Sequence, residues 1–312
     1  MKKPSSIPSN RVRLGLCCQF AEEPIRFRHA TAASLERLDR TSQLARLGEI
    51  CADNAAALHA SLEYCASHGI GSFRILSQVL PLRTHPTVGY LPDELPNAAA
   101  VVRAFKACGA FARKHGIRTG LHPDQFVVLN SPDPLVVRRS VADLEAQAEI
   151  AAWTGADTLN VHGGGGYGDK PKALDALRRG LDLLSPAVRT RLTLENDDRT
   201  FTPRDLLPVC KACATPLVYD VHHHRVLADG LGVAEATQLA RSTWDREPLF
   251  HLSSPLEGWK GPRPERHHDY VDPDDFPSEW ASGGLTVEVE AKAKELAVLR
   301  LAKALRGRVT LS

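Results

Sequence analysis

The stretch DTLNVHGGGGYGDKP, residues 157–171, contains the pattern that decides the fold. It opens as a run of β-forming residues, and the run ends on the metal-binding side chain of His162. Four glycines, 163–166, follow, and a helical pattern begins near Pro171. A strand that ends on such a side chain and leads through a loop into a helix is the repeating unit of a (β/α)₈ barrel, where active sites lie at the C-terminal ends of the strands.

Other runs of β-formers end on His, Asp or Glu in the same way. They are IRTGLH ending at His122, RLTLE at Glu195, PLVYD at Asp220, PLFH at His251 and LTVEVE at Glu290. Two further runs, 11–17 and 72–76, bring the strand candidates to eight, which is the number that a barrel needs.

Helical patterns separate most of these runs. We expect helices over residues 41–67, 95–115, 203–213, 232–242 and 291–306, and helices that begin near Pro134 and Pro171. An irregular stretch follows the seventh strand candidate as far as about Gly284. A doubly wound sheet would place a glycine-rich turn after the first strand, and LGLCCQF does not contain one. We therefore predict a single α/β domain, a TIM barrel over residues 11–312, after a flexible tail over residues 1–10.

The composition is that of a soluble globular protein. Of the 312 residues, 43% are hydrophobic and 24% are charged, and the net charge of +2 excludes a polycationic chain. The seven cysteines are an odd number, no secretory signal is visible and no apolar stretch reaches membrane-spanning length. We therefore expect a reducing, cytoplasmic location, no membrane attachment and no obligatory protein partner.

The side chains at the strand ends suit a metal centre. Imidazole and carboxylate without thiolate favour a hydrolytic site that holds Mn²⁺ or Zn²⁺, with Mg²⁺ as a further alternative. Glu195 is placed to bridge two ions, and Asp220 and His223 form a D-x-x-H that reaches one ion. So many ligands predict two or three divalent ions, which suits phosphodiester cleavage. We expect Glu195, His162 and Glu290 to act in catalysis.

The sequence suggests other roles for the residues beside these ligands. Tyr167 and Lys170, next to glycines that offer backbone amides to an anion, favour a phosphate contact, and Lys292 is a further candidate. Asp197 fits a loop cap. Glu288, one pleat before the strand-eight ligand, is expected deeper in the barrel or in a salt bridge.

The ordered motifs resemble those of the UV damage endonucleases. The motifs are FRILSQVLPLRTHP, GLHPDQF, NVHGGGGYGDK, LENDD, YDVHHH, FHLSS, RHHDY and VEVEAKAKE. The resemblance spans the chain from about Arg13 to Leu301. It implies a TIM barrel related to endonuclease IV and a cluster of up to three metals, typically manganese. It further implies an enzyme that nicks damaged double-stranded DNA immediately 5′ to UV photoproducts and some other lesions.

The resemblance also implies roles for single residues. The metal ligands that it implies are His122, His162, Glu195, Asp220, His223, His251, His267 and Glu290. His267 is preferred to His268 because the family's loop reads His-x-Asp-Tyr, and residues 267–270 fit that frame. Gln125 and Phe126 match a Gln-Tyr pair that family members push into the duplex beside the lesion.

The sequence departs from the family pattern at three positions. Leu249 stands where family members can carry a lysine at the metal cluster. Leu16 and Phe20 stand where polar residues can contact the lesion, which predicts a more apolar lesion pocket.

Two other functions compete with a nuclease. A divalent-metal sugar or sugar-phosphate isomerase of the xylose-isomerase type uses similar ligands but encloses a small substrate, and a catalytically silent damage-binding module would have lost ligands. A nuclease needs an open basic groove. The cations that could line it are Arg11, Arg13, Arg74, Arg83, Lys106, Arg113, Lys170, Lys260, Arg263 and Arg266.

Overall fold

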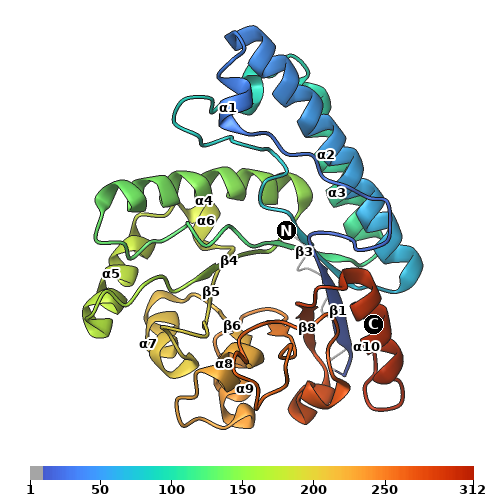
Figure 1. Ribbon diagram of the computed structural model, residues 1–312, viewed down its shortest axis with the longest axis vertical. Coiled ribbons are helices and arrows are strands. Elements are labelled where there is room, and N and C mark those ends of the chain that lie inside the picture. Colours follow the sequence, from blue (N-terminus) through green and yellow to red (C-terminus); the bar gives the residue numbers. More distant parts are fainter. Residues whose placement is uncertain (1–9) are drawn as a thin grey trace.

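Eight parallel strands form a closed barrel in the computed structural model, which describes residues 10–312 (Figure 1). The strands are β1 (Val12–Cys17), β2 (Ser72–Ile75), β3 (Arg118–Leu121), β4 (Thr158–His162), β5 (Leu192–Glu195), β6 (Leu217–Asp220), β7 (Leu249–Leu252) and β8 (Leu285–Val289). They are hydrogen-bonded in chain order, and the pairing of β1 with β8 closes the barrel. The predicted (β/α)₈ fold is therefore confirmed.

Helices connect the strands on the outside of the barrel. They are α1 (Ala32–Leu35), α2 (Arg40–His68), α3 (Ala98–Lys114), α4 (Pro134–Thr154), α5 (Lys170–Asp182), α6 (Pro186–Arg189), α7 (Pro203–Cys213), α8 (Val221–Val226), α9 (Val233–Arg241) and α10 (Lys294–Ala304). Short 3₁₀ turns are η1 (Pro92–Glu94), η2 (Pro273–Asp275) and η3 (Ser278–Ser282).

The prediction differs from the structure at three short helices and at the ends of three strands that carry candidate ligands. The sequence did not predict α1, α6 or α8, because each is at most six residues long and is set by a local cap. In α8 the side chain of Asp220 accepts a hydrogen bond from the backbone N–H of His223 at 2.7 Å. β7 does not end at His251, because its pairing with β8 continues to Leu252. β3 and β8 end one residue earlier than predicted, at Leu121 and Val289, so His122 and Glu290 directly follow their strands.

The interior of the barrel is crowded where β1 passes β2 and β8. A Cβ atom on Gly15 would lie 3.1 Å from Cγ of Glu288 and 3.1 Å from Cβ of Ser72. Glycine at this position therefore leaves room for a charged side chain inside the barrel.

The prediction that Leu16 and Phe20 face a lesion pocket is wrong. Leu16 is fully buried, and the ring of Phe20 packs against Tyr64 of α2 and Phe73 of β2 at centroid distances of 5.1 and 6.2 Å. Both side chains belong to the hydrophobic core between the barrel and its first helices. They are apolar because they are buried there, so they carry no information about the substrate.

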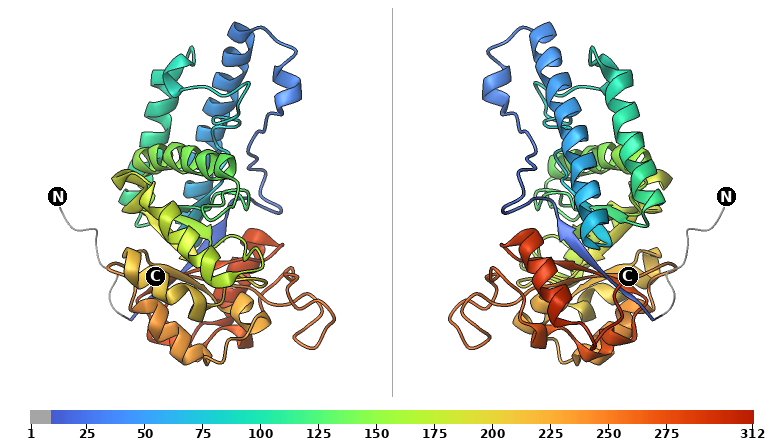
Figure 2. Two further views of the ribbon diagram at one scale, coloured as in Figure 1. Left: turned by 90° about the vertical axis from the view of Figure 1, so that its left-hand side faces the viewer. Right: turned by 90° about the vertical axis from the view of Figure 1, so that its right-hand side faces the viewer.

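α1, α2 and α3 rise beyond the barrel and form a lobe on one side of it (Figures 1 and 2). α2 has 29 residues and is therefore about 43 Å long. Asp39 caps its first turn, and Gly69, at φ 68°, ends it in the left-handed conformation.

No helix within residues 10–312 is long and apolar enough to cross a membrane. The predicted tail over residues 1–10 lies outside the described residues except for Asn10.

Candidate metal centre

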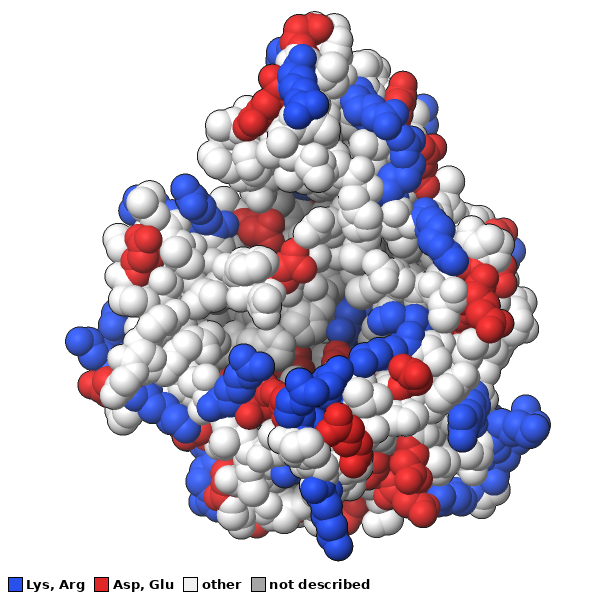
Figure 3. Space-filling view, in the orientation of Figure 1, with Lys and Arg blue, Asp and Glu red and all other residues white. Residues whose placement is uncertain are grey.

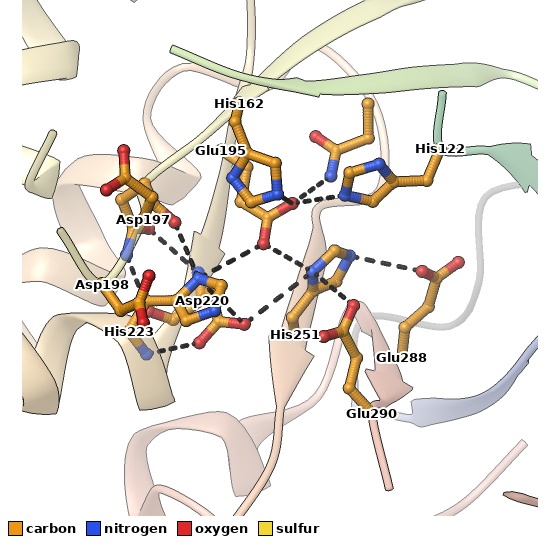
Figure 4. A network of polar contacts seen from close by, with 12 residues as sticks. His122, His162, Glu195, Asp197, Asp198, Asp220, His223, His251, Glu288 and Glu290 are labelled. Carbon is orange, nitrogen blue, oxygen red and sulfur yellow. Dashed lines mark hydrogen bonds and ion pairs between the residues drawn. The ribbon is translucent and has the colours of Figure 1, made fainter. Parts of the chain in front are cut away.

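Glu195 is the central residue of a polar cluster at the C-terminal ends of the strands (Figure 4). One carboxylate oxygen lies 2.9 Å from Nε2 of His122, and the other lies 3.0 Å from Nδ1 of His251. His223 and His162 approach the same carboxylate at 3.6 and 4.0 Å. Glu195 itself is 1% exposed, so the strand ends bring four imidazoles to one buried carboxylate.

Three overlapping sets of side chains have the spacing of metal ligands. They are His122, His162 and Glu195; Glu195, Asp220 and His223; and Asp220, His251 and Glu290. Within each set the ligand atoms lie within 4.8 Å of one another. Glu195 joins the first set to the second, and Asp220 joins the second to the third.

The buried carboxylate of Asp220 tests whether the cluster fits a cation. Its Oδ2 atom is buried and has no hydrogen-bond donor within residues 10–312. A buried carboxylate oxygen without a donor or cation is costly, so this atom fits a divalent ion. The oxygen and nitrogen ligands of the three sets fit Mn²⁺, Zn²⁺ or Mg²⁺ in their chemistry.

Two asparagines that the sequence did not single out hold the ligands in place. Asn160 donates to the Oε2 atom of Glu195 and accepts from Thr193 at 2.9 Å. The side chain of Asn196 pairs with the backbone of Asp220 through bonds of 2.9 and 3.0 Å, and the backbone carbonyl oxygen of Asn196 accepts from Nδ1 of His223 at 3.0 Å. Asn160 lies two residues before His162 on β4 and so shares its inward face, which was the available sequence signal.

A buried arginine beside the third set was also missed. Arg74 was predicted as a possible groove residue, but it is 8% exposed and its side chain points into the barrel. Its guanidinium pairs with Glu288 and Glu290, with Nη2 2.7 Å from Oε1 of Glu290, and Nη2 lies 2.8 Å from Nε2 of His251. The predicted salt bridge of Glu288 is thereby confirmed. Leu249, on the strand that carries His251, is buried and brings no charge to the cluster.

The cluster stabilises its charged forms. Burial by itself raises the pKa of Glu288, but Arg74 and His251 lower that pKa to about 2. Burial likewise lowers the pKa of His223, but the carboxylates of Asp220 and Glu195 outweigh burial and raise that pKa to about 9. The negative field of the carboxylates therefore attracts cations, whether these are protons or metal ions.

His267 lies at the edge of the cluster rather than inside one of its sets. Its Nδ1 is 3.9 Å from Oε2 of Glu290, and its ring lies 6.1 Å from that of His223. Nδ1 of His268 instead accepts from the backbone N–H of Tyr270 at 2.9 Å, in a different pocket. The geometry favours His267 over His268, although its role as a ligand stays a prediction.

The predicted DNA contacts lie around the cluster and outside it. Gln125 and Phe126 are exposed on the loop after β3, where Phe126 is 78% exposed. Tyr167, 53% exposed, lies on the loop after β4, and Lys292 is exposed after β8. Lys170 forms a 2.9 Å ion pair with Asp205, so its ammonium already has a partner.

The remaining predicted groove cations do not share one face. Arg13 pairs with Glu247 at the opposite end of β1, and Arg83 pairs with Glu149. Lys260, Arg263 and Arg266 lie together on the loop after β7. Figure 3 shows the face of the molecule that carries a central hollow, with Lys and Arg side chains along the lower edge of that hollow.

The glycine-rich loop is held by the protein itself. Gly164 has φ 85°, and Asn130 donates to the carbonyl oxygen of Gly165 at 2.8 Å and accepts from its N–H at 3.2 Å. The amide of Gly165 is therefore not free for the anion contact that the sequence suggested.

Comparisons with known proteins agree with the fold. The family model described as UV-endonuclease UvdE matches residues 12–311. The UV DNA damage endonuclease of Deinococcus radiodurans is 36% identical over 93% of this chain and 94% of its own length. That of Halalkalibacterium halodurans is 33% identical over 88% of this chain and 87% of its own length.

Solved structures with the same fold include a member of this family. The crystal structure of SacUVDE has a TM-score of 0.85 at 25% identity, covering 95% of this chain and 99% of that one. Endonuclease IV from Thermus thermophilus, at 17% identity and a TM-score of 0.59, covers 95% of this chain and 98% of that one and shares the fold. D-psicose 3-epimerase from Clostridium cellulolyticum, at 13% identity and a TM-score of 0.55, covers 95% of this chain and 97% of that one and likewise shares the fold. The family match over nearly the whole chain, together with the strand-end cluster, shows that this chain belongs to the UV-endonuclease UvdE family.

Proposed function

We propose that this protein is a metal-dependent DNA repair endonuclease that nicks the backbone immediately 5′ to UV photoproducts or related lesions. Membership of the UvdE family makes it an endonuclease, and the family relatives are named for UV-damaged DNA. The observation that carries the metal dependence is the chain of three ligand sets that share Glu195 and Asp220.

The residues of the three sets would hold the divalent ions. When bound, the ions supply Lewis acidity toward a phosphodiester and a water of lowered pKa. Glu195, held by Asn160, keeps its carboxylate in a fixed position between two sets. The side chain of His162 is 32% exposed and so is the most open of the cluster imidazoles, at the side from which a backbone phosphate can approach.

The surroundings of the cluster support a large substrate. Phe126 and Tyr167 are exposed aromatic rings on neighbouring loops, which suits stacking on bases that have left the duplex. A sugar isomerase encloses its substrate, and the epimerases are similar to this chain in fold alone. No observation favours that alternative over the nuclease.

A nicking assay tests the proposal. The purified protein, with Mn²⁺ added, is incubated with a duplex that carries one defined photoproduct and with the undamaged duplex. We expect one nick, immediately 5′ to the lesion, that disappears with a chelator and returns with Mn²⁺. Cleavage that persists in chelator would contradict the metal dependence, and turnover of a keto-sugar without any nick would contradict the nuclease.

Glu195→Gln separates catalysis from binding. The amide keeps the shape of the side chain but removes the charge that two ligand sets share, so we expect nicking to fall by at least about 10²-fold while the damaged duplex still binds. Gel-shift and nicking assays on the same sample measure both. Wild-type nicking in this variant would remove Glu195 from the centre.

A further inference from the structure

The loop after β7 forms a finger, residues 255–267, that stands out from the barrel. Pro255 and His267 form an antiparallel bridge at its base, and the backbone N–H of Leu256 donates to the carbonyl oxygen of Arg266 at 2.7 Å. The finger is the orange loop that projects from the body in Figure 2, toward the face that Figure 3 shows. Its returning limb ends at His267, beside the metal centre.

The tip of the finger is basic. Its sequence is GWKGPRP, residues 258–264, which contains no acidic residue. Lys260 and Arg263 are exposed, and within residues 10–312 neither side chain forms an ion pair or a hydrogen bond. Farther down the finger, Arg266 is compensated by Glu257 at 3.9 Å. The uncompensated cations are thus concentrated at the tip.

The tip is also pre-organised. Trp259 is 37% exposed, but its ring is fixed, because Nε1 donates to Asp275 at 2.7 Å and the guanidinium of Arg225 lies 5.4 Å from the ring centroid. Prolines 262 and 264 restrict the backbone on the other side of the tip. A fixed aromatic ring beside the two cations loses little conformational entropy when it binds a partner.

The position of the finger relates it to the predicted damage probe. β3 and β7 are four strands apart in either direction around the closed barrel. The loop with Phe126 and the finger therefore stand on opposite sides of the metal centre. A partner that lies across the mouth of the barrel and touches Phe126 on one side meets the finger on the other.

We infer that the finger is a second DNA-binding element, which holds the duplex backbone on the side of the metal centre opposite to Phe126. This inference rests on the proposed function. Lys260 and Arg263 contact backbone phosphates, and Trp259 packs against the adjoining sugar or base. Phosphates are the matching partner because Lys260 and Arg263 are exposed, uncompensated cations beside the ring of Trp259.

The salt dependence of binding tests the finger. The variant K260A/R263A is compared with K303A/R306A, which removes the same charge near the C-terminal end of α10, at the opposite end of the barrel. Each phosphate contact contributes about 0.9 to the slope of log K against log salt. We expect that slope to fall by about 2 in K260A/R263A and to stay at the wild-type value in K303A/R306A. Unchanged slopes in both variants, or equal losses in both, would overturn the inference.

Trp259 gives an independent readout. We expect Trp259→Ala to weaken binding of the duplex about tenfold, and Trp259→Phe to restore most of the affinity, because stacking needs only an aromatic face. If Trp259→Phe binds as weakly as Trp259→Ala, the stacking contact is wrong.

Nicking by the wild type and by K303A/R306A distinguishes this inference from the proposed function. If both nick the damaged duplex while the finger variants bind it normally, only the finger inference fails. If neither nicks any duplex but the salt slope falls in K260A/R263A, the finger stands as a DNA-binding element and the nuclease proposal fails.

Discussion

Glu288 lies between a cation and a candidate metal ligand. Nδ1 of His251 faces Glu195, whereas Nε2 lies 3.3 Å from Oε2 of Glu288. Nε2 also lies 2.8 Å from Nη2 of Arg74, so Glu288 would hold the imidazole both directly and through the guanidinium, with Nδ1 left to face a metal ion. The guanidinium of Arg74 keeps that carboxylate charged. Glu288 is thus a positioning residue for His251.

We predict that Glu288→Gln weakens Mn²⁺ binding about 10- to 100-fold, the usual cost of losing a carboxylate behind a ligating histidine. Isothermal titration with Mn²⁺ measures the affinity without any activity. The matched control is Glu279→Gln, because Glu279 is exposed on η3. Equal affinities in the two variants would show that Glu288 serves only the packing of the barrel.

Phe126 is the most exposed of the large hydrophobic side chains within residues 10–312. If it stacks on a base beside the lesion, Phe126→Ala costs about 1–3 kcal/mol of binding to the damaged duplex. Fluorescence anisotropy with damaged and undamaged duplexes checks this. Leu183→Ala is the control, because Leu183 is 60% exposed at the end of α5. An affinity loss of the same size for undamaged DNA would argue against a role in damage recognition.

Some residues of the metal centre could be predicted from the sequence, and others could not. His162 and Glu195 were predictable because each ends a short strand, and barrel strands end on one face. Arg74 was not, because an arginine in a strand looks the same in sequence whether it faces solvent or Glu288, which is 214 residues away. The pairing of Lys170 with Asp205 was hidden for the same reason.

At the scale of elements, one carboxylate ties the loop after β1 to the start of α10. Glu295 is 1% exposed, and its carboxylate accepts hydrogen bonds from the backbone N–H groups of Ala21, Glu22 and Glu23 at 2.7, 2.8 and 3.1 Å. These bonds lower the pKa of Glu295 despite its burial. The loop is therefore fixed by α10 rather than by its own sequence.

We predict that Glu295→Ala lowers the free energy of unfolding by about 1–3 kcal/mol, because it removes the acceptor of three backbone N–H groups and empties a buried position. Urea denaturation measures the change. Glu49→Ala on α2 is the control, because the side chain of Glu49 is 63% exposed and, within the described part of the chain, pairs with Arg46 alone. Equal stability of the two variants would mean that water replaces the lost acceptor.

Long helices were predictable to within a few residues, and the short ones were not. α7 was predicted at its observed bounds, because Thr202 and Asp205 form a capping box and Pro203 occupies the first turn. The lobe of α1, α2 and α3 could not be foreseen, because its direction depends on packing between elements that are distant in sequence. Leu16 and Phe20 were misread for this reason.

At the scale of the whole molecule, pH sets the balance between protons and metal ions. The pKa of His223 rises from 6.5 to about 9 in the folded protein. Its charged form therefore stabilises the metal-free fold fully below pH 6.5, and this contribution is lost as the pH rises through about 9. A metal ion needs the neutral imidazole and must displace that proton.

We predict that the apparent Mn²⁺ affinity rises with pH up to about 9, by about tenfold per pH unit for each proton displaced. Calorimetric titrations in buffers of different ionisation enthalpy measure both the affinity and the protons released. His223→Asn should flatten this rise and weaken binding. An affinity that is constant from about pH 6 to 9 would contradict the displacement of a proton.

Because neighbouring ligand sets share a carboxylate, the three sets are not independent binding sites. The middle set consists of Glu195, Asp220 and His223. It shares Glu195 and Asp220 with the other two sets, and only His223 belongs to it alone. Ions held by the first and third sets would therefore compete with an ion in the middle set for the shared carboxylates, and by thermodynamic linkage each ion would weaken the other by the same factor. We expect a Mn²⁺ binding isotherm with unequal steps, in which an ion in the middle set would exchange most readily. A titration that fills all positions with one uniform affinity would show that the sharing has no energetic consequence.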